Sequence, residues 1–167
     1  MDRLTPEQRH RCMSRIRSKD TKPERVVRQM LHAMGFRFRL HVARLPGKPD
    51  IVLPRHKKAI LVHGCFWHAH GCRVGGKAPA THEPFWETKF ARNTARDRRS
   101  IQQLWQIGWQ VLVVWECEAL DPERLYETLA AFMSASAAPD YEAMAEQSSF
   151  YGMVAESSDW PGSLSDN

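Results

Sequence analysis

The segment from Ala59 to Cys72 constrains the fold and chemistry of this chain more than any other part of the sequence. A short apolar run, Ala59-Ile-Leu-Val62, is followed within ten residues by two cysteines, three histidines and two large aromatic residues. A strand that only filled a core would alternate Val and Ile with small residues. Metal ligands beside aromatic residues instead predict a site that binds a metal ion and contacts something outside the protein.

Charge is distributed unevenly along the 167 residues. Residues 1–133 contain 24 basic and 13 acidic residues, a net charge of +11, whereas residues 134–167 contain six acidic residues and no Lys or Arg. A domain with this excess attracts polyanions through counterion release, and nucleic acid is the commonest such partner. The alternative is a basic surface that is merely solvated.

Four unevenly spaced cysteines and a polar N-terminus favour a reducing cytoplasm over a secreted, disulfide-bonded protein. No apolar run approaches the roughly 20 residues that a bilayer requires. We therefore expect a soluble, cytoplasmic protein without a membrane segment.

Helix-capping patterns and composition divide the chain into three parts. Thr5-Pro-Glu-Gln8 resembles a helix start and predicts a basic helix within residues 1–20, close to a phosphate backbone. Residues 21–133 are expected to form the folded domain. Residues 134–167 are acidic and lack periodicity, so we expect a largely disordered tail.

The folded domain has the pattern of an α/β protein. Thr21-Lys-Pro-Glu24 predicts a helix that stops at Gly35, and the alternation over residues 36–41 predicts a half-buried strand. Apolar runs at 51–53 and 59–62 predict an antiparallel hairpin, with Asp50 and Val62 near the same end.

The second half of the domain continues this pattern. A helix over about 85–108 is followed by a continuous apolar strand over 109–115, which predicts burial on both faces within a mixed or parallel sheet. Asp121-Pro-Glu then caps a final helix.

A candidate metal centre combines four residues. Cys65, His70 and Cys72 lie within eight residues, and Cys117 follows the strand 109–115. Thiolates with an imidazole are a ligand set that Zn2+ prefers, and four protein ligands would make the site structural. Buried free cysteines are the alternative, and His63 and His68 compete with His70 for the imidazole position.

A candidate hydrolytic site lies at the start of the hairpin. Asp50 begins a strand opposite one that ends in His63, an arrangement suited to Mg2+, with Glu24 as an outer-shell carboxylate. His68 is a candidate general base because the pKa of free imidazole lies near working pH. A capping role for Asp50 and a structural role for His68 are the alternatives.

Aromatic residues supply a candidate DNA contact. Phe66 and Trp67 are consecutive and both project outward if they lie in a loop, and Phe85-Trp86 repeats the pattern before an arginine-bearing helix. Such residues stack on bases or wedge between base pairs, although core packing is the default for a single Trp. Trp105, Trp109 and Trp115 are assigned to the core.

Several rare clusters recur together in one known family. The chain from about Leu4 to Phe132 closely resembles the very short patch repair (Vsr) DNA mismatch endonucleases. The motifs that carry this resemblance are Pro49-Asp50, the hairpin, His63-Gly-Cys-Phe-Trp-His-Ala-His-Gly-Cys72, Pro79-Ala-Thr81, Phe85-Trp86, Arg96-Asp-Arg-Arg99, Gly108-Trp109 and Val114-Trp-Glu-Cys117.

The resemblance implies a PD-(D/E)XK nuclease-like fold, with a central mixed sheet flanked by helices and a structural zinc site. It also implies Mg2+-dependent nicking of one DNA strand 5′ of the thymine in a T:G mismatch that arises when 5-methylcytosine deaminates. The expected partners are mismatched duplex DNA and repair-machinery proteins, and the expected state is a nucleoid-associated monomer in a prokaryote-like cytoplasm.

The same resemblance implies roles for individual residues. Asp50 and the main-chain carbonyl of Val62 would hold Mg2+, His68 would activate water or shuttle its proton, and His63 and Glu24 would assist. The implied zinc ligands are Cys65, His70, Cys72 and Cys117. The implied DNA contacts are Phe66, Trp67 and Trp86 as a wedge, Lys89 and Asn93 at the mismatched bases, and Met13 and Ile16 in the opposite groove.

Two departures and two rival functions accompany this expectation. Val62 stands where the family often has Thr, and Val62-His63-Gly64 replaces the acid-x-Lys of the wider nuclease superfamily. The rivals are a non-catalytic, zinc-stabilised DNA-binding module and a zinc hydrolase that uses His63 and His68 as ligands.

Overall fold

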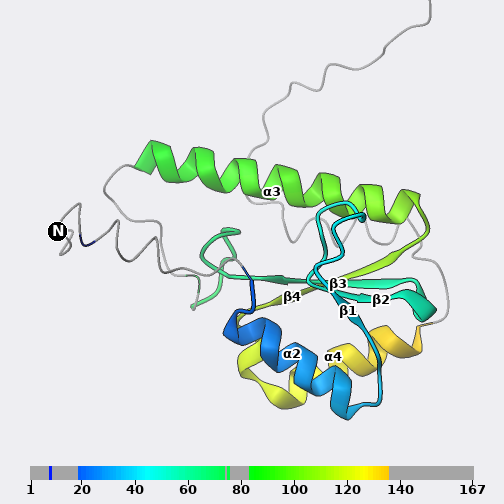
Figure 1. Ribbon diagram of the computed structural model, residues 1–167. Coiled ribbons are helices and arrows are strands. Elements are labelled where there is room, and N and C mark those ends of the chain that lie inside the picture. The colour runs from blue at the N-terminus through cyan, green and yellow to red at the C-terminus, as the bar shows by residue number, and fades with distance from the viewer. Residues whose placement is uncertain (1–7, 9–18, 74, 76–82, 136–167) are drawn as a thin grey trace, which may run out of the picture.

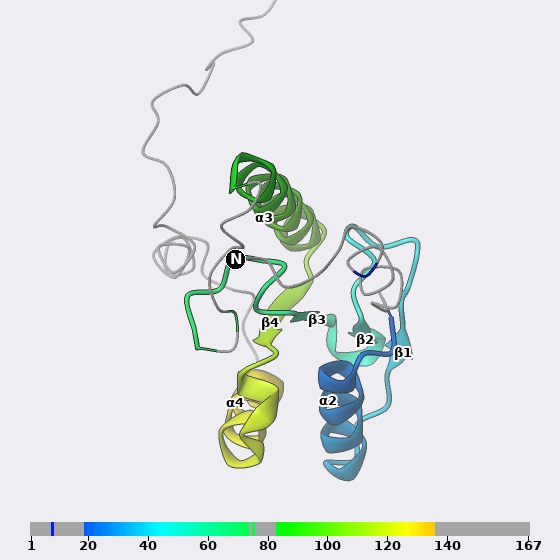
Figure 2. The ribbon, with the colours of Figure 1, turned by 90° about the vertical axis from the view of Figure 1, so that its left-hand side faces the viewer.

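A computed structural model describes Gln8, residues 19–73, Gly75 and residues 83–135. These residues form a four-stranded sheet between two helical layers, with the strands in the order β1-β2-β3-β4. The strands are β1 (Arg39–Leu40), β2 (Ile51–Leu53), β3 (Lys58–His63) and β4 (Gln110–Trp115). Helix α3 (Glu83–Gln106) crosses one face, while α2 (Lys22–Ala33) and α4 (Pro122–Ser134) cover the other (Figures 1 and 2). The predicted mixed α/β architecture is therefore confirmed.

Alternation along β3 gives each face of the sheet its own apolar core. Ile60 packs with residues of α2 and α4, including Leu31 and Leu129, whereas Ala59 and Leu61 pack with Ile101 and Leu104 of α3 and Val111 of β4. Successive side chains of a strand point to opposite faces, so one strand supports both layers. This sandwiching holds β3 rigidly at the centre of the domain.

The predicted hairpin is present. β2 and β3 pair antiparallel with Ile51 opposite Ile60, and η1 (Pro54–His56) with left-handed Lys57 makes the connection. The backbone N–H of Val62 donates to Oδ2 of Asp50 at 2.8 Å. The prediction that Asp50 and Val62 lie near the same end of the hairpin is confirmed.

Parallel pairing of β3 with β4 brings two distant segments to the same edge of the sheet. His63, the last residue of β3, is in register with Trp115, the last residue of β4. Cys65 and Cys117 each follow two residues later, and η2 (Glu118–Leu120) begins just beyond. Cys65 and Cys117, which are separated in the sequence by the 24-residue helix α3 and by β4, are thus neighbours at the carboxyl ends of β3 and β4.

The helix starts follow the predicted capping chemistry. Thr21 Oγ1 accepts from the Glu24 backbone N–H, and the Glu24 side chain reaches back to the Thr21 N–H, which completes a capping box for α2. Asp121 accepts from the Arg124 N–H at the start of α4. At the other end of α4, buried Lys58 donates to the backbone carbonyls of Phe132, Met133 and Ala135.

Two predictions about strands are wrong in part. Of residues 36–41, only Arg39 and Leu40 form a strand, Leu40 is exposed, and left-handed His41 ends the extended run. β4 contributes Val111 to the core under α3 and Val114 to the core under α2 and α4, but it lies at the edge of the described sheet, not in its interior, and only these two of its residues are buried. Its apolar sequence reflects packing against α3 on one side and α2 and α4 on the other.

The predicted basic helix of residues 1–20 and the predicted tail of residues 134–167 lie largely outside the described residues. Among the helices described, none has the length and apolar character needed to cross a membrane.

Candidate active site and metal centre

A cleft of about 1030 Å³ opens at the carboxyl ends of β3 and β4. One wall comes from the start of α2 and the turn before β2, the floor from the end of β3, and the opposite wall from α3. The cleft contains every described residue expected to take part in hydrolysis, namely Glu24, Asp50, Val62, His63 and His68, and also Trp67, Lys89, Asn93, Asp97 and Glu116.

Asp50 is a partly buried carboxylate at the base of this cleft. Its Oδ2 accepts the Val62 N–H, and Oδ1 lies 3.7 Å from Nδ1 of His41. Burial raises the pKa of Asp50 above its ordinary value, the Val62 hydrogen bond lowers it, and the nearby charge of Glu24 raises it again, leaving a net increase. A cation beside Asp50 and Glu24 would offset this cost.

Glu24 is 2% exposed and has several partners. Its Oε2 accepts from Arg28 at 2.7 Å and from the Asp20 N–H at 3.0 Å, while Oε1 accepts from the Thr21 hydroxyl at 2.9 Å. Glu24 therefore serves the capping box of α2 and also presents negative charge to the cleft, consistent with an outer-shell position.

His63 and His68 are stacked face to face. Their ring centroids are 3.9 Å apart and their planes differ by 3°. Burial, followed by repulsion from a charged His68, lowers the pKa of His63 to about 3, so His63 stays neutral at working pH. One ligand atom from each of His63, His68 and Asp97 lies within 4.8 Å of the others, so this group could also hold a metal ion. The two ring planes are parallel, however, and do not direct both imidazole lone pairs at one point, which suits the zinc ion of the rival hydrolase poorly.

Asp97 is a candidate site residue to which the sequence pattern assigned no role. Its Oδ2 lies 2.5 Å from Nδ1 of His68, and the carboxylate is buried on α3. Burial alone would raise the pKa of Asp97, but the hydrogen bond and charge of His68 outweigh it, so the pKa lies below its ordinary value. An ionised acceptor at Nδ1 fixes the ring and leaves Nε2 of His68 as the nitrogen able to take a proton.

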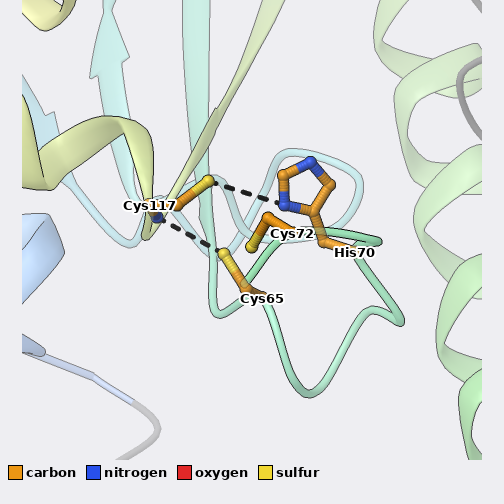
Figure 3. A group of neighbouring side chains, drawn as sticks. All are labelled: Cys65, His70, Cys72 and Cys117. Atoms are coloured by element: carbon orange, nitrogen blue, oxygen red, sulfur yellow. Dashed lines mark hydrogen bonds between the residues drawn. The ribbon is translucent and has the colours of Figure 1, made fainter. Parts of the chain in front are cut away.

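The four predicted metal ligands converge (Figure 3). Cys65, His70 and Cys72 come from the loop after β3, and Cys117 comes from the turn after β4. One ligand atom from each lies within 4.8 Å of all the others. Sγ of Cys117 is 3.6 Å from Nδ1 of His70, close to the separation of about 3.6 Å expected between ligands of a tetrahedral zinc ion. The cluster could therefore bind a metal ion.

Backbone amides support two of these thiols. The Cys117 N–H donates to Sγ of Cys65 at 3.3 Å, and the Gly75 N–H donates to Sγ of Cys72 at 3.3 Å. Only glycine fits at position 75, because a Cβ there would lie 2.4 Å from the carbonyl oxygen of His70. Hydrogen bonds to sulfur stabilise thiolates and orient metal ligands.

In the absence of metal, the cluster favours neutral side chains. Burial raises the pKa of Cys65 to about 12 and raises the pKa of Cys117, while burial lowers the pKa of His70. Neutral His70 is already in its ligand form, but the thiols must lose protons to bind a metal.

Trp115 separates the metal cluster from the histidine pair instead of filling the core as expected. It is half-buried, its ring stacks on His70 at 4.1 Å, and its edge faces His63 at 5.4 Å. Glu116 makes a second connection, because its Oε2 accepts from the Cys65 N–H at 3.3 Å while it lines the cleft. The metal cluster thus supports the loop that carries His68.

The aromatic residues form a cluster at the rim of the cleft. Phe66 contacts Trp67, Trp86 and Phe90 with ring centroids 5.2 to 5.5 Å apart. Phe66 and Trp67 are half-buried in a loop, but Trp86 is only 5% exposed. Trp86 was expected to enter DNA as part of the wedge. In the structure it is buried, and Phe66 and Trp67 pack against it.

Two polar residues of α3 complete this rim. Lys89 places its Nζ 5.0 Å from the ring centroid of Trp67 and 5.4 Å from that of Trp86. Asn93 donates from Nδ2 to the backbone carbonyl of Trp67 at 2.9 Å, which anchors the loop to the helix. Met13 and Ile16, expected to contact the opposite groove, lie outside the described residues.

Known proteins are similar to this chain in sequence. Residues 1–74 match the family model described as DNA mismatch endonuclease Vsr. The type II nicking enzyme V.XorIIP of Xanthomonas oryzae pv. oryzae is 51% identical over 120 residues, which cover 72% of this chain and 88% of the relative. The type II nicking enzyme V.NmeAIP of Neisseria meningitidis is 44% identical, over 70% of this chain and 83% of the relative.

The DNA mismatch endonuclease Vsr of Escherichia coli is 43% identical over 117 residues, which cover 70% of this chain and 74% of the relative. The chain belongs to the Vsr family of DNA mismatch endonucleases.

Proposed function

We propose that this chain nicks one strand of duplex DNA 5′ of the thymine in a T:G mismatch, by Mg2+-dependent hydrolysis of a phosphodiester. The single observation that carries the catalytic part is the joint placement of Asp50 and the His68–Asp97 pair in one cleft. Membership of a family whose relatives are named as mismatch and nicking endonucleases supports DNA as the substrate.

Asp50 would hold the catalytic cation together with the main-chain carbonyl of Val62. The oxygen-rich surroundings suit a hard ion. Burial, and then the nearby charge of Glu24, raise the pKa of Asp50, and a cation would offset both effects. Bound Mg2+ would supply stabilisation of the negative charge that develops on the phosphate. Because Val62 would contribute only backbone oxygen, the absence of a side-chain hydroxyl at this position is compatible with binding.

His68 would act as general base on the attacking water. Asp97 holds Nδ1 of His68, so Nε2 is left to take the proton, and the positive charge then formed on the ring is stabilised by the Asp97 carboxylate. His63 would remain neutral beneath it. Nδ1 of His63 is buried and has no hydrogen-bond partner among the described residues.

The cluster of Cys65, His70, Cys72 and Cys117 would hold structural Zn2+. Three sulfurs and one imidazole nitrogen within mutual reach fit a closed tetrahedral site. The ion would fasten the loop after β3 to the turn after β4, and so set the positions of Trp67 and His68.

Phe66 and Trp67, supported by Trp86, would form a wedge beside the mismatch, with Lys89 and Asn93 near the mismatched bases. A T:G wobble pair is easier to unstack than a sound pair, so inserting rings costs less there. This difference would provide selectivity. The basic N-terminal region with Met13 and Ile16 would grip the opposite groove, and residues 21–133 would form the nuclease domain.

The test compares wild type with Asp50→Ala on a T:G duplex in Mg2+. Asp50→Ala should abolish nicking while DNA affinity is retained, because the affinity comes mainly from the basic surface. Arg124→Ala, a surface change on α4, serves as the control and should nick normally. Mg2+-dependent nicking by Asp50→Ala would reject the assignment of Asp50, and DNA binding without any nicking by wild type would favour the rival DNA-binding module.

A further inference from the structure

His41 lies behind the two carboxylates of the cleft. Its Nδ1 is 3.7 Å from Oδ1 of Asp50, and its Nε2 is 3.6 Å from Oε2 of Glu24. Neither His41 nor its neighbour Arg28 lines the cleft, although both carboxylates do. His41 is therefore placed to act on the carboxylates rather than on the DNA.

The backbone at His41 is held in an uncommon conformation. Its φ is +46°, in the left-handed region, and its N–H donates to the Asp50 carbonyl at 3.3 Å. Residues other than glycine rarely adopt this conformation, and it persists where surrounding contacts hold it. The contacts here bind His41 to Asp50 through the backbone as well as through the side chain.

Arg28 determines which imidazole nitrogen carries the proton. Its Nη2 lies 3.1 Å from Nε2 of His41 and also donates to Glu24, while its Nη1 donates to Asp20. A guanidinium can only donate hydrogen bonds, so Nε2 of His41 must accept. The proton of the neutral ring then lies on Nδ1, the nitrogen that faces Asp50.

We propose that His41 is a positioning residue for Asp50. The imidazole, held by Arg28, offers its Nδ1–H to Oδ1 of Asp50, while the Val62 N–H donates to Oδ2. The two donors together orient the carboxylate toward the catalytic cation. This inference rests on the proposed function, in which Asp50 binds that cation. Metal-binding carboxylates are commonly oriented by such hydrogen bonds. The 3.7 Å separation is longer than a hydrogen bond, and contacts of this kind commonly shorten when the reacting complex forms.

The same geometry excludes His41 as a cation ligand. Asp20, Glu24 and His41 each place one ligand atom within 4.8 Å of the other two, but the Arg28 guanidinium already contacts all three side chains and takes the position that a cation would need. With Nε2 accepting from Arg28 and the proton on Nδ1, neither nitrogen of His41 offers a free lone pair. The effect of His41 must therefore pass through Asp50.

The experiment measures Mn2+ binding to the full chain by electron paramagnetic resonance, beside nicking kinetics in Mn2+. His41→Gly removes the imidazole without penalising the left-handed backbone, and His41→Asn keeps an N–H close to the Nδ1 position in a residue that tolerates this conformation. Lys57→Gly is the matched control, because Lys57 also has positive φ (+53°) but lies at the opposite end of the hairpin.

His41→Gly should bind Mn2+ about tenfold more weakly than wild type, the scale typical of losing a supporting hydrogen bond at a metal site. KM for DNA should be unchanged, His41→Asn should recover most of the lost Mn2+ affinity, and Lys57→Gly should match wild type. Wild-type Mn2+ affinity in His41→Gly, an equal loss in His41→Asn, or an equal loss in Lys57→Gly would each overturn the inference.

Asp50→Asn, measured in the same series, separates this inference from the proposed function. Loss of Mn2+ binding in Asp50→Asn without loss in His41→Gly would overturn the role of His41 alone. Retention of wild-type Mn2+ affinity in Asp50→Asn would overturn the assignment of the cation to Asp50, and the role of His41 with it.

Discussion

His68 and Asp97 are joined by a 2.5 Å contact between Nδ1 and Oδ2, although 29 residues separate them in the sequence. The contact links the loop after β3 to the middle of α3. It connects the segment expected to handle the proton with the helix that forms the opposite wall of the cleft. This pairing supports the proposal that the buried carboxylate of Asp97 belongs to the reaction site.

We expect Asp97→Asn to lower the single-turnover rate of nicking by about 100-fold, within the range that general acid–base catalysis contributes. The amide preserves the shape of Asp97 but cannot stabilise a positively charged His68. Rapid-quench measurements on a T:G duplex check this. Asp121→Asn is the control, because asparagine caps α4 as well as aspartate does. A wild-type rate in Asp97→Asn would remove Asp97 from the mechanism.

Cys117→Ser should abolish stoichiometric zinc binding and lower the melting temperature, because the loop after β3 would lose its attachment to the turn after β4. Zinc content by mass spectrometry and thermal unfolding of the full chain measure these effects. Cys12→Ser, which changes a cysteine that is not in the proposed ligand set, should keep both properties. If Cys117→Ser retained one zinc ion per chain, the proposed ligand set would be incorrect.

Zinc binding should release protons and strengthen as pH rises. Burial raises the pKa of Cys65 to about 12 and also raises that of Cys117, so both thiols are protonated in the metal-free chain at neutral pH. Thiolates are the binding form, so binding releases up to about three protons from the cluster. Calorimetric titrations in two buffers of different ionisation enthalpy count them. If zinc affinity did not change between about pH 6 and pH 8, the range around working pH, this account would be contradicted.

Trp67→Ala should reduce the preference for T:G over paired DNA by about tenfold, the scale of one lost base stack. Zinc content should stay the same, because Trp67 lies outside the cysteine cluster. The measured quantity is the ratio of nicking rates on the two duplexes. Tyr126→Ala removes an exposed aromatic residue from α4 and should leave the ratio unchanged. Equal losses of zinc and of cleavage in Trp67→Ala would count against a wedge.

Local chemistry made much of this site predictable from the sequence. The capping box of Thr21 and Glu24 marks the start of α2, and the hairpin brings Asp50 to Val62 because few residues connect its strands. The cysteine cluster was predictable from ligand type. Its convergence depends on the parallel pairing of β3 with β4, which the apolar character of residues 109–115 indicated.

Features set by tertiary packing were harder to predict. Asp97 pairs with His68 only because α3 lies across the sheet. The sequence held one signal for this pairing: Asp97 lies on the helix face that also carries Ile101 and Leu104, where an unpaired charge is costly. The sequence predicted neither the burial of Trp86 nor the stacking of Trp115 on His70, because an aromatic residue suits a core, a rim or a ring stack equally well. No sequence pattern indicated the role that we propose for His41, because that role depends on the contact between His41 and Arg28.

The most direct test incubates the full chain and Mg2+ with end-labelled T:G, U:G and fully paired duplexes, and maps each product. The account predicts one nick, on the thymine-bearing strand 5′ of the mismatched base, with the paired duplex left intact. Equal nicking of the paired duplex, or a nick on the guanine-bearing strand, would contradict it.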